Sequence, residues 1–368
     1  MRLRKRQNEV IHYVWFNNQH VLALVDSLNA LGVAAIKSKP KFPKQLVVIL
    51  LAPIYPVWYR LSGTKIIHIH WVAGQFLPPR IRSDFGRNIF FYLFCIFLYV
   101  AKILGLKIVW TAHNLLPHEK VFPDDLKARR KLVGKCSAIF AFDEGVKSKI
   151  HEMFSGNNVK VIPAAEPPLT PTETKAATRE RLGIQDGQVN FVALGHVRHY
   201  KAPDVFLRAA AQADIQAHLT LAGAPGPADL MAELTELVEH LPEKHLSATI
   251  KFDYLSDGEF ANLLQAADFL VCPFRKISNS GIVNNALELG IPLILPNLPE
   301  LAWVPKEAAL WFEAQDPVTS LAKVLQQAQT LSSDQLADMQ TAAQTHLKAR
   351  GWSNYVRAQA DIYRELIS

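Results

Sequence analysis

The sequence contains only three cysteines among its 368 residues. Three is an odd number, and the spacing of Cys95, Cys136 and Cys272 fits neither a zinc site nor a redox motif. Each of them lies in or near an apolar run, which is typical of buried, reduced thiols in a cytosolic protein. The sequence therefore offers no disulfide framework and no cysteine-based metal centre.

The sequence also lacks an apolar run of the roughly 20 residues that a membrane-spanning helix needs. The two strongest candidates, residues 46–59 and 88–104, are shorter; the first contains two prolines and the second contains Lys102. We expect each to form a helix that covers a sheet or lies at a membrane surface, and both readings can hold at once. The basic N-terminus precedes only a short apolar stretch without a small-residue cleavage site, so we expect no signal peptide.

Acidic residues are scarce in the first half of the chain. Residues 1–165 hold 24 Lys and Arg against 9 Asp and Glu, a formal charge of +15, whereas the remainder carries −8. The basic half therefore suits something anionic, such as lipid headgroups or a polyprenyl diphosphate, with Trp58 nearby. A nucleic-acid partner would require a recognised module or an aromatic stacking platform, and the sequence has neither. The basic residues in question are Arg2, Arg4, Lys5, Arg6, Lys37, Lys39, Lys41 and Lys44.

Strand-like and helix-like runs alternate in both halves of the chain, which predicts parallel sheets with crossover helices. Between them lies EPPLTPTETKAAT, rich in Pro and Thr and without apolar periodicity, as expected of a linker. We therefore predict an α/β protein of two doubly wound, Rossmann-like domains facing across a cleft. The predicted parts are a domain over 1–165, a linker over 166–180, a domain over 181–350 and a C-terminal helix over 351–368, with packing on the first domain as one option.

Two strand-to-helix junctions in the second domain carry residues suited to a diphosphate. GHVRHYK (195–201) follows one strand-like run, and a helix that starts near residue 280 follows the strand-like FLVCPF. Glycine permits a close backbone approach, Arg and Lys suit phosphate groups, and a helix start offers unpaired N–H groups. The plain alternative for Arg198 and Lys201 is two solvated basic side chains on a turn. The predicted diphosphate ligands are Gly195, Arg198, Lys201, Asn279, Ser280 and Gly281.

Four separated motifs resemble those of GT-B glycosyltransferases. GHVRHYKAPDVFL is similar to the Gly-x-x-Arg-x-x-Lys-Gly loop of retaining members, and AADFLVCPF followed by ALELGIPLILP resembles their donor-binding segment. The form SNSGIVNNALELG, with IIHIHWVAG and KIVWTAHNLLPHE, is closely similar to the xanthan-type β-mannosyltransferases of bacterial exopolysaccharide assembly. The resemblance extends from about residue 65 to about residue 300.

This resemblance implies the GT-B fold and transfer of a sugar, preferably mannose, from a nucleotide diphosphate donor to a lipid-linked acceptor. It implies no metal, and no Asp-x-Asp pair stands where Mg²⁺ would be held. The superfamily often carries two glutamates separated by seven intervening residues, but Ile277 and Asn285 stand at those positions here. Their absence puts the ribose contact and retention in doubt, so we favour inversion.

Inversion needs a general base near the acceptor hydroxyl. The loop HNLLPHE follows a strand of the first domain and should lie at the carboxyl edge of its sheet. Glu119 or His118 could take the proton, His113 could hold the donor sugar or phosphate, and Asp143 is a further candidate. For Glu119 the alternative is an acid at a helix start, paired with Lys120 or with the helix dipole.

Other polar residues are assigned to substrates with plain alternatives beside them. His68 and His70 lie two residues apart on one strand, so their side chains share one face of it. A metal site would need a third ligand, and none is evident, so we expect cleft-lining or core residues. Asparagines after the first strand suit an acceptor sugar but are equally common in turns. The predicted acceptor residues are Asn17, Asn18 and His70, and the predicted donor nucleoside and sugar residues are Asn284, Asn285 and Tyr254.

The sequence thus predicts a metal-independent hexosyltransferase with no cofactor, peripheral on the cytoplasmic face of a membrane, with GDP-mannose as the preferred donor. A retaining enzyme with a UDP-sugar and a sugar-nucleotide epimerase of the same fold are the alternatives. An exported sugar-binding protein and a catalytically inactive transferase partner are further rivals.

Overall fold

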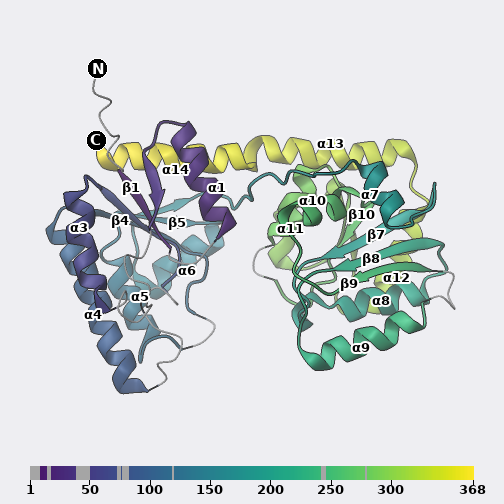
Figure 1. Cartoon of the computed structure of the whole chain (residues 1–368), viewed down its shortest axis with the longest axis horizontal. Coiled ribbons are helices and arrows are strands. Elements are labelled where there is room, and N and C mark those ends of the chain that lie inside the picture. The colour runs from purple at the N-terminus through teal and green to yellow at the C-terminus, as the bar shows by residue number, and fades with distance from the viewer. Residues whose placement is uncertain are drawn as a thin grey trace. The chain divides into compact units, whose positions relative to one another are not determined.

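The computed structural model describes residues 9–14, 18–38, 50–72, 76, 83–117, 120–241, 246–277 and 280–368. The chain forms two compact units: unit 1 comprises residues 1–164 and 352–368, and unit 2 comprises residues 165–351 (Figure 1). Several residues singled out above lie outside the described part: Arg2, Arg4, Lys5, Arg6, Asn17, Lys39, Lys41, Lys44, His118, Glu119 and Asn279.

Unit 1 contains a six-stranded sheet in the order β2-β1-β3-β4-β5-β6, and its neighbouring strands run parallel. The strands are β1 (Val10–Tyr13), β2 (Ala35–Lys37), β3 (Ile66–Ile69), β4 (Lys107–Thr111), β5 (Ala138–Ala141) and β6 (Val159–Val161). The helices are α1 (Gln19–Ala30), η1 (Ala52–Ile54), α3 (Tyr55–Leu61), α4 (Asp84–Ile103), α5 (Asp125–Val133), α6 (Glu144–Phe154) and α14 (Trp352–Ile367). The C-terminal helix α14 belongs to this unit and contacts α1 and β3.

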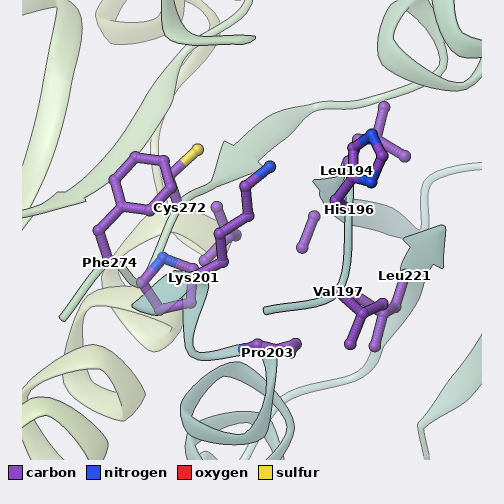
Figure 2. A pocket seen from close by; sticks show the side chains of 12 residues that line it. Leu194, His196, Val197, Lys201, Pro203, Leu221, Cys272 and Phe274 are labelled. Atoms are coloured by element: carbon purple, nitrogen blue, oxygen red, sulfur yellow. The ribbon is translucent and has the colours of Figure 1, made fainter. Parts of the chain in front are cut away.

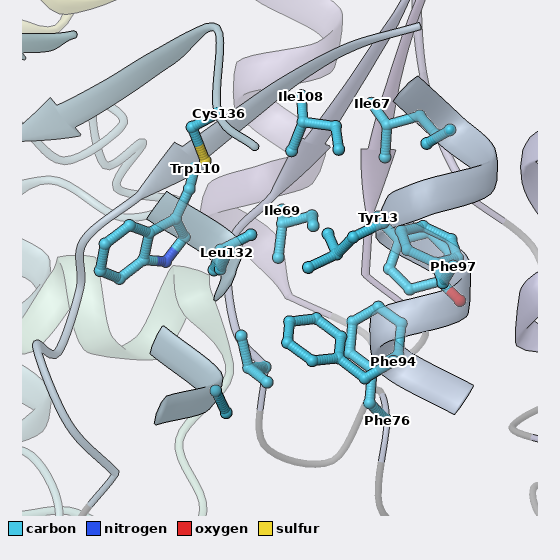
Figure 3. Close-up of a cluster of buried hydrophobic side chains, with 14 of the residues drawn as sticks. Tyr13, Ile67, Ile69, Phe76, Phe94, Phe97, Ile108, Trp110, Leu132 and Cys136 are labelled. Atoms are coloured by element: carbon cyan, nitrogen blue, oxygen red, sulfur yellow. The ribbon is translucent and has the colours of Figure 1, made fainter. Parts of the chain in front are cut away.

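Side chains alternate between the two faces of the unit 1 sheet, and this alternation separates its core from its polar groups. Tyr13, Ile67 and Ile69 point into an apolar cluster with aromatic rings of α4 such as Phe94 and Phe97 (Figure 3). His12 on β1 and His68 on β3 are register partners on the opposite face, where Tyr363 of α14 contacts His68. α14 thus covers a polar patch, whereas α4 covers the apolar face.

Unit 2 contains a second six-stranded parallel sheet in the order β12-β11-β10-β7-β8-β9. Its strands are β7 (Val189–Leu194), β8 (Ala217–Ala222), β9 (Ser247–Lys251), β10 (Phe269–Val271), β11 (Leu293–Pro296) and β12 (Ala309–Phe312). Its helices are α7 (Lys175–Arg181), η2 (His199–Lys201), α8 (Pro203–Gln212), α9 (Ala228–Glu239), α10 (Asp257–Gln265), α11 (Gly281–Glu288), η4 (Pro299–Leu301), η5 (Lys306–Ala308), α12 (Pro317–Gln329) and α13 (Ser333–Arg350). The prediction of two doubly wound, Rossmann-like domains is confirmed.

The segment predicted as a linker contains a helix at its end, α7. Thr174 caps this helix by accepting a hydrogen bond from the backbone N–H of Ala177. Charged pairs then fix it to the sheet: both Lys175 and Arg179 bond Asp268 at 2.9 Å. The absence of apolar periodicity misled the prediction, because α7 is held by ion pairs rather than by an apolar stripe.

Candidate functional site

The unit 2 sheet has a topological switch point between β7 and β10, where the order of strands reverses along the chain. The loops after these two strands leave the sheet in opposite directions, which opens a crevice at its carboxyl edge. A pocket lies at this point (Figure 2). Its lining residues are Ala193, Leu194, Gly195, His196, Val197, Lys201, Pro203, Leu221, Val271, Cys272, Pro273 and Phe274.

Lys201 is the central polar group of this pocket. Figure 2 shows its side chain between Cys272 and Phe274 on one side and His196 on the other. A Cβ at position 195 would lie 2.6 Å from Lys201 Nζ, so the ammonium rests against the backbone of Gly195, which has a φ of +110°. Glycine at this position therefore provides both the turn after β7 and the space for the ammonium group.

The electrostatics of the pocket favour an anion. Burial lowers the pKa of Lys201, and the positive charge of Arg198 lowers it further. Burial also raises the pKa of Cys272 to about 12, so this thiol beside Lys201 stays neutral. The ammonium is thus a desolvated cation, and among the described residues no carboxylate acts on its pKa. An anionic ligand would restore the stabilisation that the ammonium loses on burial.

Arg198, the second predicted cation, has a different position. Its Nη1 donates to the carbonyl oxygens of Val197 at 2.8 Å and Pro225 at 3.3 Å, so it bridges the loops after β7 and β8. Arg198 is not one of the described residues that line the pocket. Its role as a diphosphate ligand stays a prediction, and its observed contacts support the shape of the loop that carries Lys201.

Three further residues build the loops, and sequence reasoning missed them. Gly223 and Gly226 allow backbone contact, because a Cβ on Gly223 would collide with the carbonyl oxygen of Gly195, and one on Gly226 with that of Val197. Arg275 ties the two switch-point loops together, because its Nη1 donates to Asp204 Oδ1 at 3.0 Å and to the His199 carbonyl at 2.8 Å. The run LAGAPGP after a predicted strand was the available signal for the two glycines.

The predicted helix start near residue 280 exists, but it faces a carboxylate of the protein itself. A Cβ at Gly281 would lie 2.9 Å from Glu166 Oε1, and a carboxylate is favourable at a helix N-terminus. Among the described residues, neither Ser280 nor Gly281 lines the pocket. A diphosphate held jointly by Lys201 and this helix start would have to displace Glu166, so the shared cradle stays a prediction.

The three residues predicted to contact the donor nucleoside and sugar lie in different settings. Asn284 is buried and donates to the Ser280 carbonyl at 3.3 Å, which supports the start of α11. Asn285 Oδ1 is a buried acceptor with no hydrogen-bond partner among the described groups. Tyr254 is exposed, and its ring lies edge-on to that of His196, with 6.1 Å between centroids. Tyr254 therefore lies beside a residue of the pocket lining.

The carboxyl edge of the unit 1 sheet carries a chain of histidines. His113 Nε2 at the end of β4 lies 3.2 Å from His70 Nδ1, and His70 Nε2 lies 2.9 Å from His12 Nδ1. His68 bonds Tyr363 at 2.5 Å and Thr111 at 2.7 Å. The structure thus brings together two predicted site residues, His70 and His113, and adds His12, which sequence reasoning missed.

Burial keeps these histidines neutral. It lowers the pKa of His12 and of His113 to about 3, with the charge of His20 as a smaller cause, and it lowers those of His68 and His70 well below the usual value. His12, His68 and His70 each place a nitrogen within 4.8 Å of the others. However, both nitrogens of His68 and of His70 already take part in hydrogen bonds, so the geometry is that of a hydrogen-bonded network rather than of open metal ligands.

Two predicted polar residues of unit 1 act as helix caps. Asn18 Oδ1 accepts from the backbone N–H of Val21 at 2.9 Å at the start of α1. Asp143 Oδ1 accepts from that of Val146 at 2.7 Å at the start of α6. The plain alternative for Asn18 therefore describes its observed contact, and the carboxylate of Asp143 is likewise engaged in capping.

Residues 188–330, within unit 2, match the family described as glycosyl transferases group 1. The match lies wholly within unit 2 and covers most of it. A curated relative, a D-inositol 3-phosphate glycosyltransferase from Thermobispora bispora, is 26% identical over 205 residues, which cover 52% of this chain and 47% of the relative. The chain thus spans about half the length of the curated relatives it matches first.

Solved structures of glycosyltransferases share the fold of the whole chain. A glycosyltransferase from Rickettsia africae has a TM-score of 0.71 at 14% identity, with 99% of each chain covered. The Anabaena protein HepE, solved in complex with UDP and glucose, has a TM-score of 0.70 at 12% identity, covering 97% of this chain and 99% of HepE. At such identities the likeness establishes the fold alone, and the fold is GT-B, as the sequence motifs implied.

Proposed function

We propose that this protein is a glycosyltransferase that binds the diphosphate of a nucleotide-sugar donor at the pocket around Lys201. The observation that carries this proposal is the desolvated ammonium of Lys201 at the β7–β10 switch point of a group 1 glycosyl transferase domain. Negative charge grows on the departing diphosphate in the transition state, and a fixed cation stabilises it there. The proposed reaction therefore needs no metal ion and no cofactor, with the nucleotide sugar as substrate.

The finer proposal is transfer of mannose from GDP-mannose to a lipid-linked oligosaccharide, with inversion. The resemblance to xanthan-type β-mannosyltransferases supports GDP-mannose, whereas the complex of HepE with UDP and glucose supports a UDP-sugar as the alternative. Because His113 is neutral at pH 7 and hydrogen-bonded to His70, it suits a sugar hydroxyl better than a phosphate. His118 and Glu119 remain the candidate bases.

Thermal unfolding with GDP, UDP and their sugar conjugates, in buffer with EDTA, tests the donor. A ligand that binds only the folded chain at 100 times its Kd adds about 2.7 kcal/mol to the unfolding free energy, which raises Tm. Protection by guanine or by uracil nucleotides alone identifies the donor class. Absence of protection by all of them would count against the proposed function.

The change Lys201→Ala tests the site itself. We expect turnover to fall by about 10²- to 10³-fold, the usual effect of removing one contact to transition-state charge. Lys323→Ala, at an exposed position of α12, is the matched control and should leave turnover unchanged. Full activity of the Lys201 variant would place the diphosphate elsewhere.

A further inference from the structure

The outer side of α4 carries a row of large apolar side chains exposed to solvent. Their spacing alternates between four and three residues, which aligns them along one side of the helix. The neighbouring η1–α3 segment, which contacts α4, adds four more exposed apolar residues. Together they form what we call the α3–α4 face: Ile54, Val57, Trp58, Leu61, Phe85, Ile89, Tyr92, Ile96, Tyr99 and Ile103, each at least 39% exposed.

α4 cannot leave the domain to cross a bilayer. By length and composition it is a candidate membrane span, with 20 residues and a mean hydropathy of 1.4. Its inner side, however, provides Phe90, Phe94, Phe97 and Ala101 to the core of unit 1, where each is at most 4% exposed (Figure 3). If α4 spanned a bilayer, these side chains would have to leave the core of unit 1. Only the exposed outer side chains of α4 are therefore available to contact another surface.

The rim of the α3–α4 face is basic. On the α5 side, Lys135 Nζ lies 5.8 Å from the centroid of the Tyr99 ring and Lys127 Nζ 5.8 Å from that of Phe91. On the α3 side, Arg60 Nε donates to the Leu104 carbonyl at 3.2 Å at the end of α4. The carboxylate of α4, Asp84, is paired with Lys120 at 3.1 Å. An apolar strip with tyrosines and a tryptophan, bordered by cations, matches the boundary between acyl chains and anionic headgroups.

We propose that the α3–α4 face docks onto an anionic phospholipid surface, with α4 lying in the plane of the membrane. Lys127, Lys135 and Arg60 would then meet headgroup phosphates, and each such residue strengthens binding by a factor of about five. A second copy of the chain fits this face less well, because self-pairing would bring the same basic rims together, and Asp84, the carboxylate of α4, is already paired with Lys120. The inference rests on the proposed function in one respect: a docked unit 1 would sit where a lipid-linked acceptor is found.

Flotation of the full chain with vesicles tests the proposal. We expect binding to phosphatidylcholine vesicles that contain a quarter phosphatidylglycerol, and at least tenfold weaker binding to phosphatidylcholine alone. Ile96→Ser with Tyr99→Ser should weaken binding at least tenfold through loss of the apolar contact. Lys127→Glu with Lys135→Glu should do the same, whereas Lys306→Glu with Lys323→Glu in unit 2 is the charge-matched control and should bind like the parent chain.

Each outcome bears on the proposal. No flotation with either vesicle would overturn it, as would binding that survives both pairs of substitutions. Light scattering that shows a dimer dissociated by Ile96→Ser with Tyr99→Ser would overturn it in favour of a second copy. Nucleotide protection is measured in parallel on the same variants: vesicle binding without protection contradicts the proposed function alone, and protection without vesicle binding contradicts the docking alone.

Discussion

The two units share an architecture but differ in what occupies the carboxyl edge of the sheet. Each contains six parallel strands with a reversal of strand order, between β1 and β3 in unit 1 and between β7 and β10 in unit 2. In unit 1 that edge is filled by imidazoles that bond one another and by Tyr363 of α14. In unit 2 glycines stand at the corresponding loops, and a pocket with one ammonium group remains open.

The difference shows that the side chains at the switch point decide the chemistry, not the topology. A histidine after a strand fills the crevice and is neutral when buried, so unit 1 offers hydrogen bonds but little charge. Glycine after a strand leaves the crevice empty, so Lys201 can enter it from the following helical turn. Under the proposed function, charge stabilisation would therefore belong to unit 2, and hydroxyl recognition would belong to unit 1.

Acidification should separate the stabilities of the two units more than any other change, because it should destabilise unit 1 first. The folded-state pKa of His12, His68, His70 and His113 is lowered, so below pH 6.5 the unfolded chain binds more protons than the folded one. The stabilisation is present above pH 6.5 and is lost as pH falls toward about 3, the folded-state pKa of His12 and His113. Each histidine costs up to about 1.4 kcal/mol of unfolding free energy per pH unit in that window.

Hydrogen exchange at pH 7.5 and 5.5, corrected for intrinsic rates, measures this loss separately in peptides of β3 and of β8. Unit 2 is the internal control, because its described residues include a single buried histidine, His218, whose pKa is lowered to about 4, whereas those of unit 1 include His12, His68 and His70. Equal loss of protection in the two units, or an earlier loss in unit 2, would contradict the assignment of acid sensitivity to the histidine chain.

Sequence patterns predicted the fold well, because alternation of apolar runs depends on local periodicity alone. The strand before Gly195 and the helix that starts at residue 281 are found where they were expected. The site was predicted in part. The proximity of Lys201 to Gly195 could be predicted, because the two residues lie six positions apart in one loop. The contact of Gly281 with Glu166 could not, because Glu166 lies more than a hundred positions away in the sequence.

The histidine chain shows the same limit. His68 and His70 can be recognised from the sequence, because they lie two residues apart on one strand. His12 joins them only through the pairing of β1 with β3, and Tyr363 only because α14 packs on unit 1. Such partners need the tertiary fold, and the same holds for caps: Asn18 looks like a ligand after a strand but is used by the helix that follows it. Loop position alone does not separate a substrate ligand from a cap.

Tyr363→Phe sharpens the comparison by removing the link between α14 and the histidine face. The hydroxyl bonds His68 Nδ1 and Gln359 Oε1, and its loss leaves buried polar groups without a partner. We expect the unfolding free energy of unit 1 to fall by about 1–3 kcal/mol, measured by urea titration. Tyr92→Phe, at an exposed position of α4, is the matched control and should change it by less than about 0.5 kcal/mol. An equal effect of the two substitutions would mean that the Tyr363 hydroxyl contributes nothing to the attachment of α14.

The smallest effect concerns the backbone of the unit 2 loop, at Ala202. This residue follows Lys201 with φ +50° and ψ +49°, a left-handed conformation that favours glycine, and the related glycosyltransferase loops have glycine at this position. Ala202→Gly relieves that strain but removes a buried methyl group and adds chain entropy, so we expect a net change in unfolding free energy within about 1 kcal/mol. Ala209→Gly, also fully buried but inside α8, has no strain to relieve and should cost at least about 1 kcal/mol more. Equal losses of unfolding free energy at the two positions would show that the positive φ of Ala202 stores no strain. The loop that carries Lys201 would then have no backbone strain at this position.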